Sequence, residues 1–142
     1  MTDQTQSQVG YLPPAAILLG RRLLGFDAER GEASLEFIAR PEFANRHGSV
    51  QGGILAAMLD SAAAAALLAS LPSDRTAMTI QLDAAFIKPA PIGPLRAVAR
   101  LVARDDRSAT VEAEIAPEAG DVAARATARF RILEAKTKAE RR

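Results

Sequence analysis

The chain has 142 residues, of which 49% are apolar and 25% are charged, as is ordinary for one globular domain. Its 18 basic and 17 acidic side chains give a net charge of +1, which argues against a broad nucleic-acid-binding face. The sequence contains no cysteine, which excludes disulfide bonds, thiolate nucleophiles and cysteine-based zinc sites.

The N-terminal part predicts a lead, a short helix and two strands. Residues 1–10 are polar and lack the basic-then-apolar order of a signal peptide, so we expect a disordered lead and a cytoplasmic protein. Residues 11–20 favour a short helix, because proline stands near its first turn and glycine at its end. Residues 21–39 predict two short strands joined by a turn at Gly31.

A long apolar helix is predicted next, from about Gly52 to Ser70, where a Pro-containing segment ends it. We do not expect this helix to span a membrane, because it is mostly alanine and the acid at its centre, Asp60, is costly in lipid. Successive residues are about 100° apart, so Asp60 falls roughly opposite a bulky stripe that should face a sheet. The stripe consists of Ile54, Leu55, Met58 and Leu59.

Period-two alternation predicts strands over most of the remaining chain. These segments are residues 79–87, 95–104, 109–117 and 122–133, and in the first of them Ile80, Leu82, Ala84 and Phe86 are expected to share one face. Two strands with basic faces flank one with an acidic face, so Arg and Glu can pair across the sheet. We predict an α+β domain over residues 11–134, with an antiparallel sheet of five to six strands packed on one long helix, and a basic tail at 135–142.

The helix face around Asp60 is otherwise small and uncharged. Its helical neighbours are Ala56, Ala57, Ala63 and Ala64. A face exposed to water would carry several charges, so we infer that a partner subunit covers it and that Asp60 is partly buried at the interface. Buried carboxylates without a partner are costly, and carboxylates with a shifted pKa cluster at functional sites. This argument alone leaves a functional and a structural role for Asp60 equally open.

Two glycines, Gly52 and Gly53, stand at the start of the helix. Backbone N–H groups at a helix start are free to bind an anion or to polarise a carbonyl, as in an oxyanion hole. Alternatively, the glycines only permit a sharp turn from loop to helix.

A spacing pattern in this region resembles the signature of hotdog-fold acyl-CoA thioesterases, in the branch like the phenylacetyl-CoA thioesterases. The family pattern is Asn, two residues, Gly, two residues, His-Gly-Gly, six residues, Asp, and the matching positions are Asn45, Gly48, Gly52, Gly53 and Asp60. The resemblance covers about residues 18–133 and includes the strand that leads from Thr79 to Pro89 and Ala90. It implies a hotdog fold, a homodimer at least and commonly a tetramer, and no cofactor beyond the coenzyme A of the substrate.

The resemblance also implies roles for individual residues. The Gly52 N–H polarises the thioester carbonyl, and Asp60 of the other subunit activates a water or attacks directly. Asn45 holds the loop or the water, and Thr79 orients the water or Asp60. Gln51 stands where the family usually has His; it can donate a hydrogen bond or hold the acyl group, but it cannot carry a proton.

The remaining assignments concern substrate binding and the competing functions. Gly53, His47 and Lys88 are assigned to the acyl-CoA, with Lys88 facing its phosphates. A metal site is not expected, with one His and no Cys, and neither nucleic acid nor membrane is an expected partner. A non-catalytic acyl-thioester-binding protein is the alternative that Gln51 keeps open, and a hotdog dehydratase or hydratase ranks lower because it needs His and an acid together.

Overall fold

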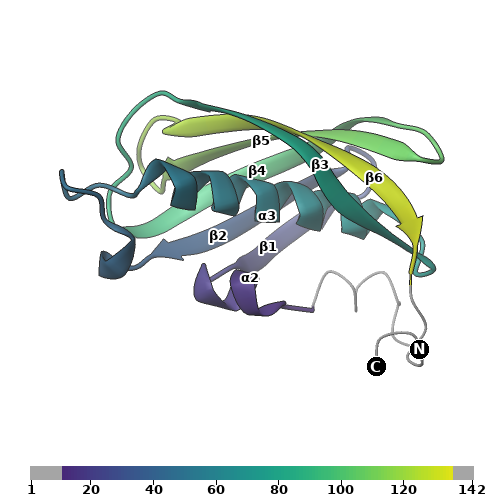
Figure 1. The fold of residues 1–142 in the computed structure, drawn as a ribbon, viewed down its shortest axis with the longest axis horizontal. Helices are drawn as coiled ribbons and strands as arrows, with labels where there is room; N and C mark the ends of the chain where they lie inside the picture. The colour runs from purple at the N-terminus through teal and green to yellow at the C-terminus, as the bar shows by residue number, and fades with distance from the viewer. Residues whose placement is uncertain (1–10, 136–142) are drawn as a thin grey trace.

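A computed structural model describes residues 11–135, so the predicted lead and most of the predicted basic tail lie outside the described residues. Six strands form one antiparallel sheet in the order β1-β2-β4-β5-β6-β3, which agrees with the predicted α+β fold (Figure 1). The strands are β1 (Arg22–Asp27), β2 (Glu32–Ala39), β3 (Arg75–Phe86), β4 (Gly93–Arg104), β5 (Ser108–Pro117) and β6 (Ala124–Glu134). The helices are α2 (Pro14–Leu18), the short 3-10 helix η1 (Pro41–Phe43) and α3 (Gly52–Ser70).

The backbone at Gln51 and at Leu71 explains where helix α3 begins and ends. Its first bonds run from the N–H groups of Ile54 and Leu55 to the carbonyl of Gln51, which leaves the two intervening glycines as the first turn. At the other end Leu71 is extended, with ψ 149°. It precedes a proline, and a residue before proline disfavours the helical region, so the helix stops at this point.

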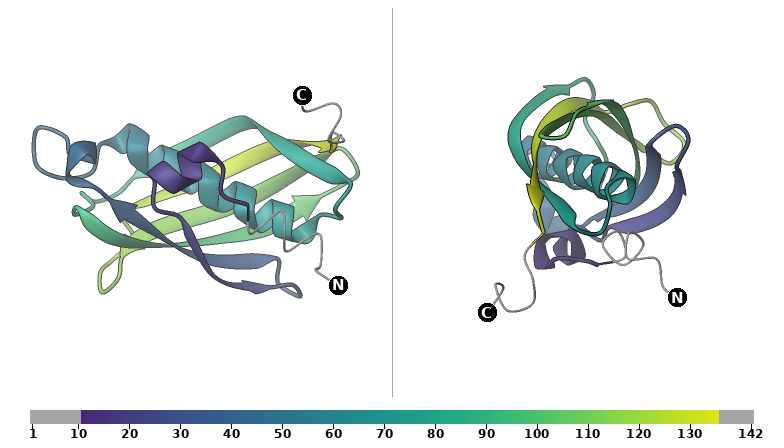
Figure 2. Two further views of the ribbon diagram at one scale, coloured as in Figure 1. Left: turned by 90° about the horizontal axis from the view of Figure 1, so that it is seen from below. Right: turned by 90° about the vertical axis from the view of Figure 1, so that its right-hand side faces the viewer.

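The sheet curls around α3 and encloses the core, as the end view in Figure 2 shows. The largest fully buried side chains come from both layers: Phe37, Phe130, Leu35, Met58, Leu59, Leu67, Leu95, Ile115 and Val111. Each contributes about 1.5–3 kcal/mol of hydrophobic stabilisation on burial. By length and composition α3 would also pass as a membrane span, but in this fold it is the core helix that the sheet covers.

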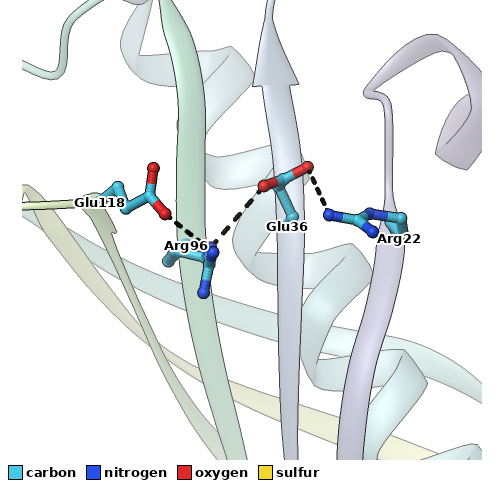
Figure 3. Close-up of polar contacts among 4 residues, drawn as sticks. All are labelled: Arg22, Glu36, Arg96 and Glu118. Atoms are coloured by element: carbon cyan, nitrogen blue, oxygen red, sulfur yellow. Dashed lines mark hydrogen bonds and ion pairs between the residues drawn. The ribbon is translucent and has the colours of Figure 1, made fainter.

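The outer face of the sheet carries the predicted cross-strand charges. Arg22, Glu36, Arg96 and Glu118 alternate in sign across this face, and Glu36 pairs with both Arg22 (3.3 Å) and Arg96 (3.7 Å) (Figure 3). Two further pairs join β4 to β5 and β5 to β6: Arg100–Glu112 and Arg125–Glu114. The prediction that Arg meets Glu across neighbouring strands is therefore confirmed. Each of these pairs has a partner that is at least 44% exposed, and surface pairs add little stability, so the buried face holds the fold together.

Strand β3 departs from the predicted alternation at Ile80. Thr79 is opposite Phe130 and Gln81 is opposite Arg129, so Ile80 is an extra residue without a partner on β6. Such a β-bulge shifts the alternation of side chains by one position. The prediction that Ile80 shares the face of Leu82 was wrong: Ile80 is 52% exposed, whereas Leu82 packs on the core.

Gly20 carries the turn between α2 and β1, and its replacement by alanine is expected to destabilise the protein. Its φ is +67°, and an added Cβ would lie 2.9 Å from the Cβ of Ile38. The left-handed conformation alone costs about 1–2 kcal/mol for an L-residue, so urea unfolding of Gly20→Ala should show at least that loss in the free energy of unfolding. Gly25→Ala, in open space on β1, is the control and should change stability by less than about 0.5 kcal/mol. Equal stability of the two variants would contradict the expectation.

Candidate functional site

The acid in the apolar helix is held by one hydrogen bond. The Thr79 hydroxyl on β3 donates to Asp60 Oδ1 over 2.7 Å. The other carboxylate oxygen, Oδ2, has no hydrogen-bond partner among residues 11–135. Asp60 is half-buried, so one oxygen is fixed while the other is open to a reactant. This arrangement suits a carboxylate that accepts a proton or attacks as a nucleophile.

The bulge in β3 is what turns Thr79 toward Asp60. With strict alternation from Leu82, Ile80 would point at α3 and Thr79 would point away from it. The extra residue reverses this on the N-terminal side of the bulge, so Thr79 lies opposite the buried Phe130 and faces the helix. Bulges often re-aim a side chain beside an active site, and this one creates the contact with Asp60.

The loop before α3 is organised by Asn45. Its Oδ1 accepts hydrogen bonds from the His47 N–H (2.9 Å) and the Ser49 N–H (3.2 Å), and its Nδ2 donates to Ser49 Oγ (3.1 Å). Gly48 has φ +82° and closes the turn by donating its N–H to the Asn45 carbonyl. Of the two roles expected for Asn45, the structure therefore places its amide in the loop-holding one.

The start of α3 presents free donors. The N–H groups of Gly52 and Gly53 donate to no oxygen in the part of the chain that the structure describes. An added Cβ on Gly53 would meet nothing within 4 Å, so the space above the first turn is open. Gln51 is exposed, and its side chain makes no hydrogen bond to the helix start. These unpaired N–H groups, at the positive end of the helix dipole, can bind an anionic or polarised oxygen.

A groove of about 350 Å³ adjoins this helix start. Its lining brings together four of the predicted site residues: Asn45, His47, Gly52 and Lys88. It also contains Phe86, whose ring lies 3.5 Å from the position of a Cβ on Gly52 and whose side chain is 54% exposed. Sequence reasoning assigned Phe86 only to the apolar face of its strand, and nothing in the alternation distinguished a groove wall from a core residue.

Charge at the mouth of the groove is modest. His47 is exposed, and within residues 11–135 its one hydrogen bond is donated by its backbone N–H to Asn45 Oδ1. Lys88 pairs with Asp121, and the hydrogen bond from Lys88 holds the pKa of the Asp121 carboxyl below its usual range. Both side chains of this pair are more than half exposed, so a phosphate can displace Asp121 at little cost.

The free N–H groups and the carboxylate of one chain are too far apart to act on one carbonyl. Gly52 and Asp60 are eight residues apart on one helix, which is about 12 Å along its axis. The face of α3 between them is small and partly open: Gly53 and Ala57 are exposed, although Ala63, which was expected on the same face, is fully buried against the sheet.

A family model described as the Thioesterase superfamily matches residues 47–124. The comparison with curated proteins finds no match.

Solved structures with the same fold include proteins of phenylacetic acid degradation. A phenylacetic acid degradation-related protein from Ralstonia eutropha is 32% identical over 90% of this chain and 98% of its own, with a TM-score of 0.85. A mutant of the phenylacetic acid degradation protein PaaI from Thermus thermophilus is 28% identical over 84% of this chain and 98% of its own, with a TM-score of 0.72. The PaaI protein of E. coli covers 94% of both chains with a TM-score of 0.81, but at 20% identity it shows the fold alone.

Proposed function

The chain belongs to the thioesterase superfamily, and on this premise we propose that it is an acyl-CoA thioesterase, which hydrolyses a thioester to a carboxylic acid and coenzyme A. The observation that carries the proposal is the Thr79–Asp60 hydrogen bond, which orients the single acid of an apolar helix and leaves its Oδ2 without a hydrogen-bond partner among the described residues. The free Gly52 N–H provides the second requirement of acyl transfer, a donor for the oxyanion.

The proposed reaction uses these two groups on opposite sides of the carbonyl. The Gly52 N–H polarises the thioester carbonyl and stabilises the oxyanion that forms when it is attacked. In one route Asp60 takes a proton from the attacking water and passes it to the departing coenzyme A thiolate. In the other route Asp60 attacks the carbonyl carbon itself, the coenzyme A thiolate leaves and takes a proton from solvent, and water then hydrolyses the mixed anhydride to release the acid and restore the carboxylate. Gln51, at the entrance to the helix, supplies a second donor or holds the acyl group.

The substrate-binding residues follow from the groove. His47 and Lys88 line the groove with exposed side chains and suit the phosphates of coenzyme A. Gly53 leaves the path along the helix open because it has no side chain. Phe86 adds an apolar wall beside the Gly52 N–H, where it keeps water away from the polarised carbonyl.

Two subunits are required if Gly52 and Asp60 are to meet at one carbonyl, given their separation of about 12 Å along α3. We therefore place Asp60 of one subunit opposite Gly52 of the other, in a homodimer at least. The edge of the sheet supports this pairing, because β3 is an edge strand with free backbone groups and with Met78 61% and Ile80 52% exposed. A further pairing into a tetramer is an extension of the same proposal.

Release of free coenzyme A from short, medium, long and aromatic acyl-CoAs tests the proposed function. Turnover of at least one class above the uncatalysed rate is the expected result. Binding of acyl-CoA without turnover would instead favour the non-catalytic binding protein, which is the second candidate because Gln51 replaces the usual His. A chain that neither binds nor hydrolyses any member of the panel would contradict both.

Mixing two inactive variants tests whether Gly52 of one subunit and Asp60 of the other form one active site. One variant, Asp60→Asn, lacks the carboxylate, and the other, Gly52→Pro, lacks the N–H donor. In a mixed dimer one of the two sites regains both groups, so co-expression should restore about a quarter of the parent activity by random pairing. Pooling the separately purified variants without subunit exchange is the control and should stay inactive. If co-expression restored nothing, the two groups would have to act within one chain.

Loss of the Thr79 hydroxyl is expected to reduce turnover without unfolding the protein. A hydrogen bond to a charged group contributes about 1.5–3 kcal/mol, so Thr79→Val should lower kcat by about tenfold to a hundredfold. Thr79→Ser keeps the hydroxyl and is the matched control. Steady-state kinetics on the best substrate of the panel decides the point, and an unchanged kcat for Thr79→Val would show that the contact with Asp60 is only structural.

A further inference from the structure

Arg21 contacts the helix turn that carries Asp60. It follows Gly20 at the start of β1, and its Nη1 donates to Ser61 Oγ (3.1 Å) and lies 3.4 Å from the Ser61 carbonyl oxygen. Its Nη2 donates to the Tyr11 carbonyl over 3.2 Å. Ser61 is the residue directly after Asp60, so the guanidinium contacts the helix turn that carries the candidate catalytic carboxylate of its own chain.

No carboxylate within residues 11–135 balances the charge of Arg21. Among residues 11–135 its only partners are neutral oxygens, and it forms no ion pair. Burial lowers the pKa of the Arg21 guanidinium, but an arginine stays charged in proteins. Holding an unpaired cation in a half-buried position costs free energy, and the adjacent Arg22 shows the usual alternative, since it is exposed and pairs with Glu36.

The guanidinium also has unused hydrogen-bonding capacity. A guanidinium has more N–H donors than the contacts to Ser61 and Tyr11 require, and Nε–H donates to no described residue. Planar donors of this kind bind a carboxylate in a bidentate manner.

The surroundings of Arg21 suit the far end of an acyl group. Helix α2 lies on the side of α3 that the sheet leaves open (Figure 1, Figure 2). It exposes Ile17 (63%) and Leu18 (50%), and the adjoining face of α3 presents the small Ala57. An acyl chain that ran from Asp60 toward α2 would pass these small and apolar side chains, with Arg21 at the junction of α2 and β1.

Resting on the proposed thioesterase function, we propose that Arg21 binds a carboxylate at the far end of the acyl group, so that the preferred substrates are coenzyme A thioesters of dicarboxylic acids. Asp60 acts on the thioester carbonyl, and the guanidinium of the same chain fixes the other end of the acyl group by charge-assisted hydrogen bonds.

Adipoyl-CoA and hexanoyl-CoA test this proposal, because they have the same chain length and differ in the terminal carboxylate. We expect the parent kcat/KM to favour adipoyl-CoA by about tenfold or more, which is the effect of one hydrogen bond to a charged group. In Arg21→Met this ratio should fall at least tenfold, and Arg21→Lys, which keeps the charge, should retain part of it. Arg22→Met is the matched control and should keep the parent ratio. Because the two kcat/KM values are measured on the same variant, a general loss of activity cancels in their ratio.

A parent ratio of one or less would overturn the proposal without any variant, and so would an unchanged ratio in Arg21→Met. If the chain hydrolysed neither thioester, the panel of acyl-CoAs would still decide the proposed function, and equilibrium binding of the same two acyl-CoAs would decide the role of Arg21. Tighter binding of adipoyl-CoA that Arg21→Met abolishes would support it, and equal affinities in the parent would overturn it.

Discussion

Replacement of Asp60 by asparagine is expected to lower kcat for coenzyme A release by about a thousandfold, the middle of the range for a lost acid–base group. The amide keeps the shape of the side chain and can still accept the hydrogen bond from Thr79. It can neither take a proton from water nor attack a thioester. The loss should therefore fall on kcat, with the affinity for acyl-CoA little changed.

The control for Asp60→Asn is Asp83→Asn, which changes an exposed carboxylate on β3 that accepts a hydrogen bond from Gln81. Both variants should keep the parent thermal midpoint, and only Asp60→Asn should lose turnover in a continuous assay for free thiol. Equal turnover by the parent and by Asp60→Asn would mean that the acid is structural, and the proposed mechanism would have to be abandoned.

Replacement of Gly52 by proline removes one hydrogen-bond donor and should lower kcat by about a hundredfold to a thousandfold, as for an oxyanion-hole donor. Proline is tolerated at the first position of a helix because the N–H there has no partner within the helix. The preceding residue, Gln51, already has φ −55° and ψ 134°, which suits a residue before proline. The added Cβ would be in ordinary contact with Phe86, at 3.5 Å.

Gly52→Ala distinguishes the effect of losing the N–H donor from the effect of adding a side chain. It adds the same Cβ contact with Phe86 as proline does, but it keeps the N–H. We expect Gly52→Ala to retain most of the activity and Gly52→Pro to lose it, with closely similar unfolding midpoints in a thermal melt. If both variants lost activity equally, the space beside Phe86 would matter more than the donor. If neither did, polarisation by this N–H would be excluded.

Local pattern was sufficient to predict most of the elements. The helix at 52–70 is bounded by a glycine pair and by a proline, and both act within a few residues. The inward faces of β4, β5 and β6 follow period-two alternation, since a regular strand must place alternate residues on opposite faces. The spacing from Gly52 to Asp60 likewise lies within one helix, so the sequence by itself determined that both groups belong to α3.

Contacts between distant segments were decided only by the tertiary structure. Whether Thr79 or Ile80 faces Asp60 depends on the bulge in β3, and the bulge exists because of the register with β6, about fifty residues later in the chain. The Arg21–Ser61 contact and the ring of Phe86 beside Gly52 likewise join segments that no local periodicity relates. Periodicity records which face a residue occupies in a regular element, whereas register and irregularity are set by packing against other parts of the chain.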